Sequence, residues 1–278
     1  MIRSAMIFAA GRGERMRPLS DATPKPLLRF GGRMLIEHHL EKLAAIGVSD
    51  VVVNTSHLAE QFPAALGDGA RWGIRIRYSY EGEKPLETGG GIKHALPLLG
   101  DAPFIGVSAD IVSDYDYAKL PAEPTGVAHL VMVPNPTFHP RGDFFLDGSR
   151  LNEDGAGEKL TFANIAVYRP SLVAGERAMY FKLLPLFQRA MRDGKLSGER
   201  FDGYWTNIGT PEQLRAVSPL PLAGEGRVRA SASNPRLKQS SNHPCPHPNP
   251  LPRAGEGILR AIARACRCLS NIRRNARR

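Results

Sequence analysis

The chain has 278 residues, of which 42% are apolar, and a formal net charge of +10. This length and composition allow the core of one large domain or two small ones, which excludes a peptide, a fibre or a coiled coil. The longest apolar runs fall well short of the roughly 20 residues that span a bilayer. The first residues lack the pattern of a secretory signal. We therefore expect no membrane segment and a cytoplasmic location.

The excess positive charge lies at the C-terminal end. After Val217 there are 12 of the 37 Lys and Arg residues but only 2 of the 27 Asp and Glu residues. Residues 1–217 therefore carry 25 groups of each sign and are formally neutral. The net charge consequently does not indicate nucleic acid or a membrane surface as a partner of the main body.

Residues 218–278 differ from the rest of the chain in composition. They hold all three cysteines, and a proline- and glycine-rich eight-residue word occurs twice, at 219–226 and 250–257. Such sequence cannot bury enough apolar surface to order itself. We therefore expect a domain over 1–217 and a low-complexity, disordered basic tail over 218–278. A basic amphipathic helix over 258–278 is the alternative reading of the last stretch.

Short apolar runs alternate with amphipathic segments along the main body. Residues 5–9 are apolar and precede a glycine, which indicates a buried strand. Residues 34–46 carry apolar side chains at helical spacing, which predicts an amphipathic helix that ends before Gly47. The alternation predicts a Rossmann-like α/β fold, with a mixed and mostly parallel sheet flanked by helices. The other predicted strands are 51–53, 74–78, 104–107, 127–133, 144–146, 162–168 and 203–206, and the other predicted helices are 58–66, 91–99, 181–191 and 211–217.

The segment after the first strand is the first candidate site, because ligands bind at the carboxyl ends of strands in such sheets. Gly11 and Gly13 allow a turn whose N–H groups face an anion, and Arg15 and Lys25 add positive charge for a polyphosphate. A dinucleotide fingerprint needs a third glycine where Met16 stands, and a P-loop needs Gly-Lys-Ser/Thr, so neither motif is present. The loop therefore predicts a different kind of nucleotide site.

Two further segments follow predicted strands. Residues 87–91 read Glu-Thr-Gly-Gly-Gly and open a helix, where free N–H groups and absent side chains allow close approach of a flat ligand. Asp110 follows the buried strand 104–107, and magnesium is the natural partner of a carboxylate placed there. Asp114 and Asp116 are expected to cap the next helix instead.

Residues 1–217 resemble the sugar-1-phosphate nucleotidyltransferases, whose signature is a glycine-rich loop with Arg followed by Lys-Pro-Leu. Within them the chain is most similar to the N-acetylmuramate-1-phosphate uridylyltransferases. The resemblance covers nearly the whole body and none of the tail, which is foreign to the family. The words that carry it lie at residues 6–19, 23–27, 86–91, 96–104, 114–116 and 141–144.

The resemblance implies a magnesium-dependent reaction of UTP with a sugar 1-phosphate, giving UDP-sugar and pyrophosphate. The sugar phosphate would be N-acetylmuramate 1-phosphate, an intermediate of peptidoglycan recycling. Lys25 would hold phosphate oxygens in the transition state and Arg15 the departing pyrophosphate. The residues expected to bind the nucleotide are Ala10, Gly11, Gly13, Glu87, Thr88, Gly89 and Gly90.

The second magnesium ligand of the family is usually an Asp in Asp-x-Gly-Thr, but this chain has Asn207 there. An amide oxygen can still coordinate magnesium, with one negative charge fewer and a weaker affinity. The expected metal ligands are therefore Asp110 and Asn207. For the sugar, we expect Arg141 to bind the lactyl carboxylate, Asn164 the N-acetyl group and Lys182 the phosphate.

Two alternatives remain open at this point. One is the same chemistry with another pair of substrates, such as thymidylyl transfer to glucose 1-phosphate or guanylyl transfer to mannose 1-phosphate. The other is a protein that binds nucleotide but is inactive, because of Asn207 and of the altered C-terminal end. Nucleotide preference distinguishes the first, and pyrophosphate release the second.

Overall fold

The computed structural model describes residues 1–155 and 157–217, and the tail predicted over 218–278 lies outside the described residues. Within this part of the chain, nine strands form one central sheet. They are β1 (Ser4–Phe8), β4 (Asp50–Thr55), β5 (Arg75–Tyr80), β6 (Phe104–Ser108), β8 (Ala128–Val133), β9 (Phe144–Asp147), β10 (Arg150–Asn152), β11 (Glu158–Tyr168) and β12 (Leu196–Arg200).

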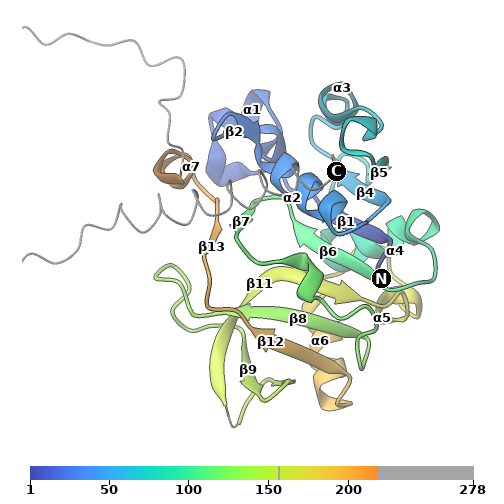
Figure 1. The fold of residues 1–278 in the computed structure, drawn as a ribbon, viewed down its shortest axis with the longest axis vertical. Helices are drawn as coiled ribbons and strands as arrows, with labels where there is room; N and C mark the ends of the chain where they lie inside the picture. The colour runs from blue at the N-terminus through green and yellow to red at the C-terminus, as the bar shows by residue number, and fades with distance from the viewer. Residues whose placement is uncertain (156, 218–278) are drawn as a thin grey trace, which may run out of the picture. The chain divides into compact units, whose positions relative to one another are not determined.

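The sheet has a parallel half and a largely antiparallel half. Its strand order is β5-β4-β1-β6-β11-β8-β12-β10-β9 (Figure 1). β5, β4, β1 and β6 run parallel, whereas β11 runs antiparallel to β6, β8 and β9. The predicted mixed sheet is therefore confirmed, but only four of the nine pairings among its described strands are parallel, and these lie mainly in the N-terminal half. The carboxyl ends of four parallel strands meet at one edge, where ligands bind in such sheets.

Two small two-stranded sheets accompany the central sheet. β7 (Ile111–Ser113) pairs antiparallel with β13 (Trp205–Asn207), and β2 (Arg29–Phe30) pairs antiparallel with β3 (Arg33–Met34). The first joins the segment after β6 to a segment almost a hundred residues later. This pairing matters for the site, because β7 begins one residue after Asp110.

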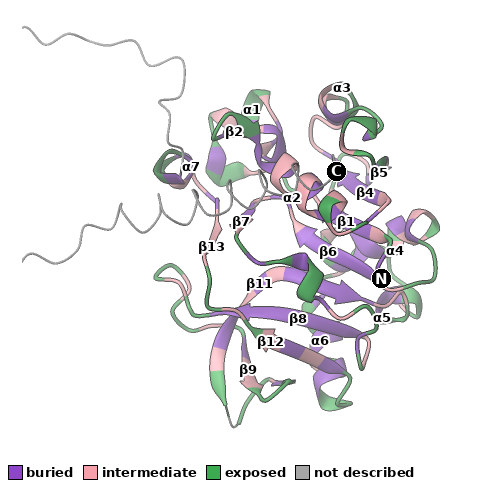
Figure 2. Ribbon diagram, in the orientation of Figure 1, coloured by how far each residue is buried: buried purple, intermediate pink, exposed green. Residues whose placement is uncertain are grey.

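Helices cover both faces of the sheet. Along β1, Ala5 and Ile7 pack with α2 and α3, whereas Met6 between them packs with α4, α5 and α6. Alternate side chains of a strand point to opposite faces, so a short continuous apolar run is buried on both sides (Figure 2). The helices are α1 (Leu19–Ala22), α2 (Leu35–Ala45), α3 (Gln61–Leu66), α4 (Glu87–Leu99), α5 (Ser171–Ala174), α6 (Leu184–Arg192) and α7 (Pro211–Val217), and the 3-10 turns are η1 (Glu14–Met16), η2 (Lys25–Leu27), η3 (Ala70–Trp72) and η4 (Tyr117–Lys119).

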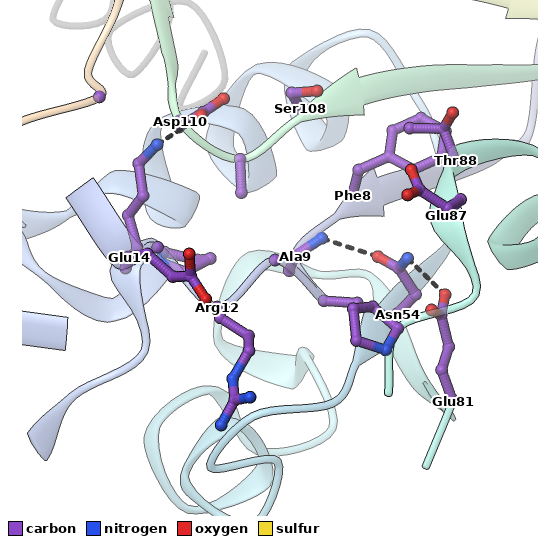
Figure 3. Close-up of a pocket in the computed structure, with 18 of the residues that line it drawn as sticks. Phe8, Ala9, Arg12, Glu14, Asn54, Glu81, Glu87, Thr88, Ser108 and Asp110 are labelled. Carbon is purple, nitrogen blue, oxygen red and sulfur yellow. Dashed lines mark hydrogen bonds and ion pairs between the residues drawn. The ribbon is translucent and has the colours of Figure 1, made fainter. Parts of the chain in front are cut away.

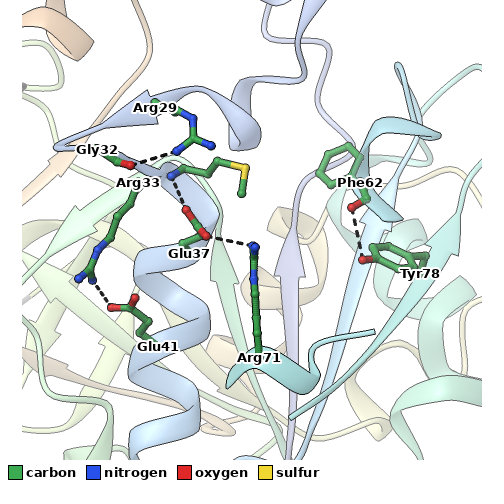
Figure 4. A network of polar contacts seen from close by, with 9 residues as sticks. Arg29, Gly32, Arg33, Glu37, Glu41, Phe62, Arg71 and Tyr78 are labelled. Atoms are coloured by element: carbon green, nitrogen blue, oxygen red, sulfur yellow. Dashed lines mark hydrogen bonds and ion pairs between the residues drawn. The ribbon is translucent and has the colours of Figure 1, made fainter. Parts of the chain in front are cut away.

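Polar contacts fix the start of α2 relative to the turn η2. The Glu37 carboxylate accepts hydrogen bonds from the Met34 backbone N–H at 2.7 Å and from the Arg71 guanidinium at 3.0 Å (Figure 4). The Leu35 N–H in turn donates to the carbonyl of Leu28, the residue that directly follows η2. The segment that carries Lys25 is thereby anchored to a helix of the core.

Most predicted elements are confirmed to within a few residues. Three predicted helix starts were wrong, because α3 begins at Gln61 instead of residue 58, α4 at Glu87 instead of 91 and α6 at Leu184 instead of 181. The strands β2, β3, β7, β10 and β12 were missed, as were the short helices α1 and α5. β12 reads Leu-Ser-Gly-Glu-Arg, with only Leu196 and Gly198 buried, so it carries little of the apolar signal of a strand. Among the described residues, no helix is long and apolar enough to cross a membrane.

Candidate active site

A cavity of about 750 Å³ opens at the carboxyl ends of the parallel strands (Figure 3). Residues from four such strand ends or the loops after them reach it, together with the start of α4. The lining carries three cations and four carboxylates, namely Arg12, Arg15, Lys25, Glu14, Glu81, Glu87 and Asp110. Two of the carboxylates, Glu81 and Glu87, form an acidic side that lies across the cavity from Asp110 (Figure 3). The lining residues are Phe8, Ala9, Ala10, Gly11, Arg12, Gly13, Glu14, Arg15, Lys25, Pro26, Asn54, Glu81, Pro85, Glu87, Thr88, Ser108, Ala109, Asp110 and Gly209.

The predicted glycine loop lines the cavity between the end of β1 and Lys25. Gly13 has a φ of +64°, which favours glycine. A Cβ atom there would lie 3.2 Å from Cβ of Lys25, so the glycine also permits the close approach of the two segments. The Ser20 hydroxyl donates to the Gly13 carbonyl at 2.8 Å and holds the turn. The structure thus brings Ala10, Gly11 and Gly13 to the same cavity as Lys25.

Lys25 and Asp110 form an ion pair in this cavity. The Lys25 Nζ donates to Oδ2 of Asp110 at 2.5 Å, and the two side chains are only 11% and 23% exposed. Residues 85 positions apart, both predicted from the sequence, therefore meet at one point. Partial burial weakens screening by water, which strengthens the attraction between the two charges.

Asn207 is held beside Asp110 by the antiparallel pairing of β7 with β13. Asn207 pairs with Ile111, and the Ile208 N–H donates to the Asp110 carbonyl at 2.9 Å. Asn207 itself is not among the lining residues, although Gly209 is. A Cβ atom on Gly209 would lie 3.2 Å from Nη2 of Arg15. The segment after β13 therefore lies against Arg15, which is predicted to bind the pyrophosphate.

The oxygen atoms near Asp110 fit the preferences of Mg²⁺. Magnesium commonly binds through one or two protein oxygens, with phosphates and water completing the shell. Asp110 offers a carboxylate and Asn207 an amide oxygen, and both come from backbone segments that are hydrogen-bonded to each other. The described residues contain no group of three or more His, Cys, Asp or Glu side chains that could hold a metal alone. A metal here would therefore depend on the nucleotide.

Lys42 of α2 supports the strand that leaves Asp110. Its Nζ donates to the carbonyls of Ser113 at 2.5 Å and Tyr115 at 3.0 Å, and lies 5.3 Å from the centroid of the Tyr117 ring. Burial lowers the pKa of Lys42 to about 8, although the nearby carboxylates of Asp114 and Asp116 oppose the shift. Asp116 caps η4 through the Ala118 N–H, as predicted, whereas no such cap involves Asp114.

A buried relay of hydrogen bonds joins three strand ends and was not predicted. The Ala9 N–H donates to Oδ1 of Asn54, and Nδ2 of Asn54 donates to Oε1 of Glu81, each at 2.7 Å. The Leu86 N–H donates to Oε2 of Glu81 at 2.7 Å. Figure 3 shows the first two of these hydrogen bonds. The relay fixes the start of the glycine loop relative to the start of α4. A sequence signal existed, since Asn54 and Glu81 each follow an apolar strand pattern at its carboxyl end.

The glycines at the start of α4 serve close packing. The N–H groups of Gly89 and Gly90 donate to the Phe181 carbonyl at 3.0 and 3.1 Å, and a Cβ on Gly90 would lie 2.0 Å from the Met179 carbonyl oxygen. The expectation that these two N–H groups are free for a ligand is therefore corrected. Glu87 and Thr88 line the cavity, whereas Gly89 and Gly90 do not.

A second cavity, of about 290 Å³, adjoins the first. Both are lined by Phe8, Thr88 and Ser108. Asn164 lines the second cavity from a bulge of β11, with a φ of +55°. Arg141 is exposed and lies two residues before the lining residue Asp143, and Lys182 precedes the lining residue Leu183. Asn164 therefore lies in the wall of this cavity. Arg141 and Lys182 are close in sequence to lining residues but do not line the cavity themselves.

Comparison with known proteins agrees with this geometry. Residues 4–128 match the family model described as nucleotidyl transferase. An N-acetylmuramate alpha-1-phosphate uridylyltransferase of Neisseria meningitidis serogroup B is 43% identical over 226 residues, covering 78% of this chain and 97% of the relative. One from Caulobacter vibrioides is 34% identical over 239 residues, covering 81% and 96%.

A solved structure supports the fold. The crystal structure of HddC from Yersinia pseudotuberculosis superimposes with a TM-score of 0.63 at 21% identity, covering 77% of this chain and 97% of that one. The family model and the two relatives show that the chain is a nucleotidyltransferase. From its similarity to the two uridylyltransferases, the chain belongs to the sugar-1-phosphate nucleotidyltransferase family.

Proposed function

We propose that this protein transfers UMP from UTP to N-acetylmuramate 1-phosphate, with magnesium, and releases pyrophosphate. The observation that carries the proposal is the Lys25–Asp110 pair beside the glycine loop, at a cavity that continues into a second one. The choice of uridine and of the muramate rests on the two relatives of that activity. The proposal places the enzyme in the cytoplasm, as a step of peptidoglycan recycling.

The reaction joins two anions, so the protein must neutralise charge and align groups. The sugar phosphate oxygen attacks the α-phosphorus, and the bond to pyrophosphate breaks. Lys25 and Asp110 neutralise each other in the structure, and the proposed ligands offer each a partner of opposite charge. Lys25 would bind phosphate oxygens as negative charge develops, and Arg15 the pyrophosphate. Asp110 and Asn207 would hold Mg²⁺, whose charge offsets that of the phosphates.

The second cavity is the proposed place of the sugar. Its wall includes Asn164, which we assign to the N-acetyl group, and its lining is otherwise largely apolar and aromatic. Arg141, an exposed guanidinium near this wall, is assigned to the lactyl carboxylate, which it can bind with two hydrogen bonds. Lys182 is assigned to the sugar phosphate. Nucleotide contacts are assigned to the glycine loop, with Ala10, and to Glu87 and Thr88.

Pyrophosphate release tests the proposal. The full chain is assayed with Mg²⁺ and each of UTP, dTTP and GTP, against the 1-phosphates of N-acetylmuramate, N-acetylglucosamine, glucose and mannose. We expect the highest kcat/KM for UTP with N-acetylmuramate 1-phosphate. A higher value for another pair would replace the assigned substrates, and UTP binding without release from any pair would show that the protein is inactive.

A further inference from the structure

Glu87, the first residue of α4, stands in an unusual backbone conformation. Its φ is +63°, a region in which residues with a side chain are uncommon. A glycine would adopt this conformation without strain. Strained residues of this kind cluster at binding and catalytic sites, where the surrounding structure holds them. The side chain of Glu87 therefore calls for a function that glycine could not perform.

The carboxylate of Glu87 is oriented but still available. The Tyr180 hydroxyl donates to Oε1 at 3.2 Å, and within the described part of the chain no hydrogen bond engages Oε2. Glu81, the other carboxylate on this side of the cavity, differs because both of its oxygens accept hydrogen bonds inside the protein. Glu87 is thus the acceptor that the acidic side of the cavity presents to a ligand.

The position of Glu87 restricts which part of a nucleotide it can meet. It lines the larger cavity and not the smaller one, and it lies across the larger cavity from Asp110 (Figure 3). A carboxylate repels phosphate, so the triphosphate belongs near Lys25 and Arg15. What remains for Glu87 is the nucleoside, and there it needs O–H or N–H donors.

The ribose fits this requirement better than the base. Its 2′- and 3′-hydroxyl groups are donors on adjacent carbons, which suit the two acceptor oxygens of one carboxylate. Uracil instead presents a single N–H between two carbonyl oxygens, which a carboxylate repels. We propose that Glu87 accepts hydrogen bonds from the ribose hydroxyls and thereby selects ribonucleotides over deoxyribonucleotides. The choice of uridine in the test rests on the proposed function, but the role of Glu87 does not depend on the base.

Equilibrium binding tests the role of Glu87 without turnover. Calorimetry with Mg²⁺ and no sugar phosphate compares UTP, 2′-deoxy-UTP and 2′,3′-dideoxy-UTP on the full chain, on Glu87→Gly and on Glu83→Gln. Glu83 is exposed in the same loop and does not line the cavity, so its variant is the matched control. Glycine suits the backbone at position 87, and a thermal melt close to that of the unaltered chain verifies that Glu87→Gly folds.

The unaltered protein and Glu83→Gln should bind UTP about 10- to 100-fold tighter than dideoxy-UTP, as for lost hydrogen bonds to a charged group. In Glu87→Gly this ratio should fall to within about threefold, through weaker UTP binding alone. Equal affinity for the two nucleotides in the unaltered protein, or discrimination that survives in Glu87→Gly, would overturn the inference. If the protein binds no UTP, the proposed function fails, and GTP with its dideoxy form then tests Glu87 by the same criteria.

Discussion

Lys25 is the residue on which the proposed chemistry depends most directly. Its ammonium group is mostly buried and lies in the cavity against a single carboxylate. Lys25→Ala should lower kcat at least ~100-fold, comparable to the loss of one preorganised electrostatic donor, and should leave the fold intact. Steady-state pyrophosphate release measures the effect, with Lys84→Ala, an exposed lysine outside the cavity lining, as the control. Normal turnover in Lys25→Ala would remove Lys25 from the mechanism.

Asn207 gives a second prediction at the same scale. The pairing of β13 with β7 places Asn207 beside the backbone of Asp110, where an Asp side chain would add a negative charge. Asn207→Asp should therefore lower the Mg²⁺ concentration at half-saturation, with equal or higher turnover. A magnesium titration of the activity measures this. An unchanged titration curve would mean that residue 207 is not a ligand of the metal.

At the level of single elements, Lys42 links α2 to the segment after β7. Its pKa of about 8 lies below the ordinary value of 10.5, because burial disfavours the charged form. Between these two pH values the unfolded chain binds a proton that the folded protein has released. The free energy of unfolding should therefore rise with pH in this window, by at most about 1.4 kcal/mol per pH unit.

Tyrosines oppose this rise at higher pH. Burial raises the pKa of Tyr78 to about 12 and shifts those of Tyr115, Tyr117 and Tyr168 in the same direction. Above pH 10 the folded protein holds protons that the unfolded chain loses, so stability falls again. Urea unfolding from pH 7 to 10 should show the rise in the unaltered protein and a flatter profile in Lys42→Met. Equal slopes in both would assign the rise to other groups.

The elements also show which parts of the structure could be predicted from the sequence. β1, β4 and β6 are short apolar runs buried on both faces, and this pattern survives any change of neighbour. β12 is mostly polar and β7 is only three residues long, and both form because partner strands far away in the chain satisfy their backbone groups. Lys25 and Asp110 follow strand or loop patterns that predict phosphate and metal chemistry. The Asn54–Glu81 contact depends on the register between β4 and β5, which periodicity does not determine.

The function of the glycines in α4 illustrates the same limit. A Gly-Gly-Gly run at a helix start fits both ligand approach and close packing. Only the position of residues 179–181, which come almost ninety residues later, shows that the run serves packing. Glu87 and Thr88, which reach the cavity, could not be separated from the glycines by sequence pattern alone.

At the level of the whole molecule, the described residues that line the two cavities all lie between Phe8 and Gly209. Deletion of the chain after Val217 should therefore leave the affinity for UTP nearly unchanged, and within about threefold. Calorimetry on the full chain and on the shortened one makes the comparison. A large loss of affinity would show that residues 218–278 contribute to nucleotide binding.

The two cavities adjoin, because both are lined by Phe8, Thr88 and Ser108. Under the proposed function, this adjacency affects how fast the product leaves. Each substrate occupies one compartment, but the UDP-sugar occupies both, and its two halves are covalently tethered. When one half detaches, the other keeps it at high effective concentration next to its own compartment, so it rebinds before it can diffuse away. We therefore expect the joined product to stay longer than either substrate, and its departure to limit the catalytic cycle.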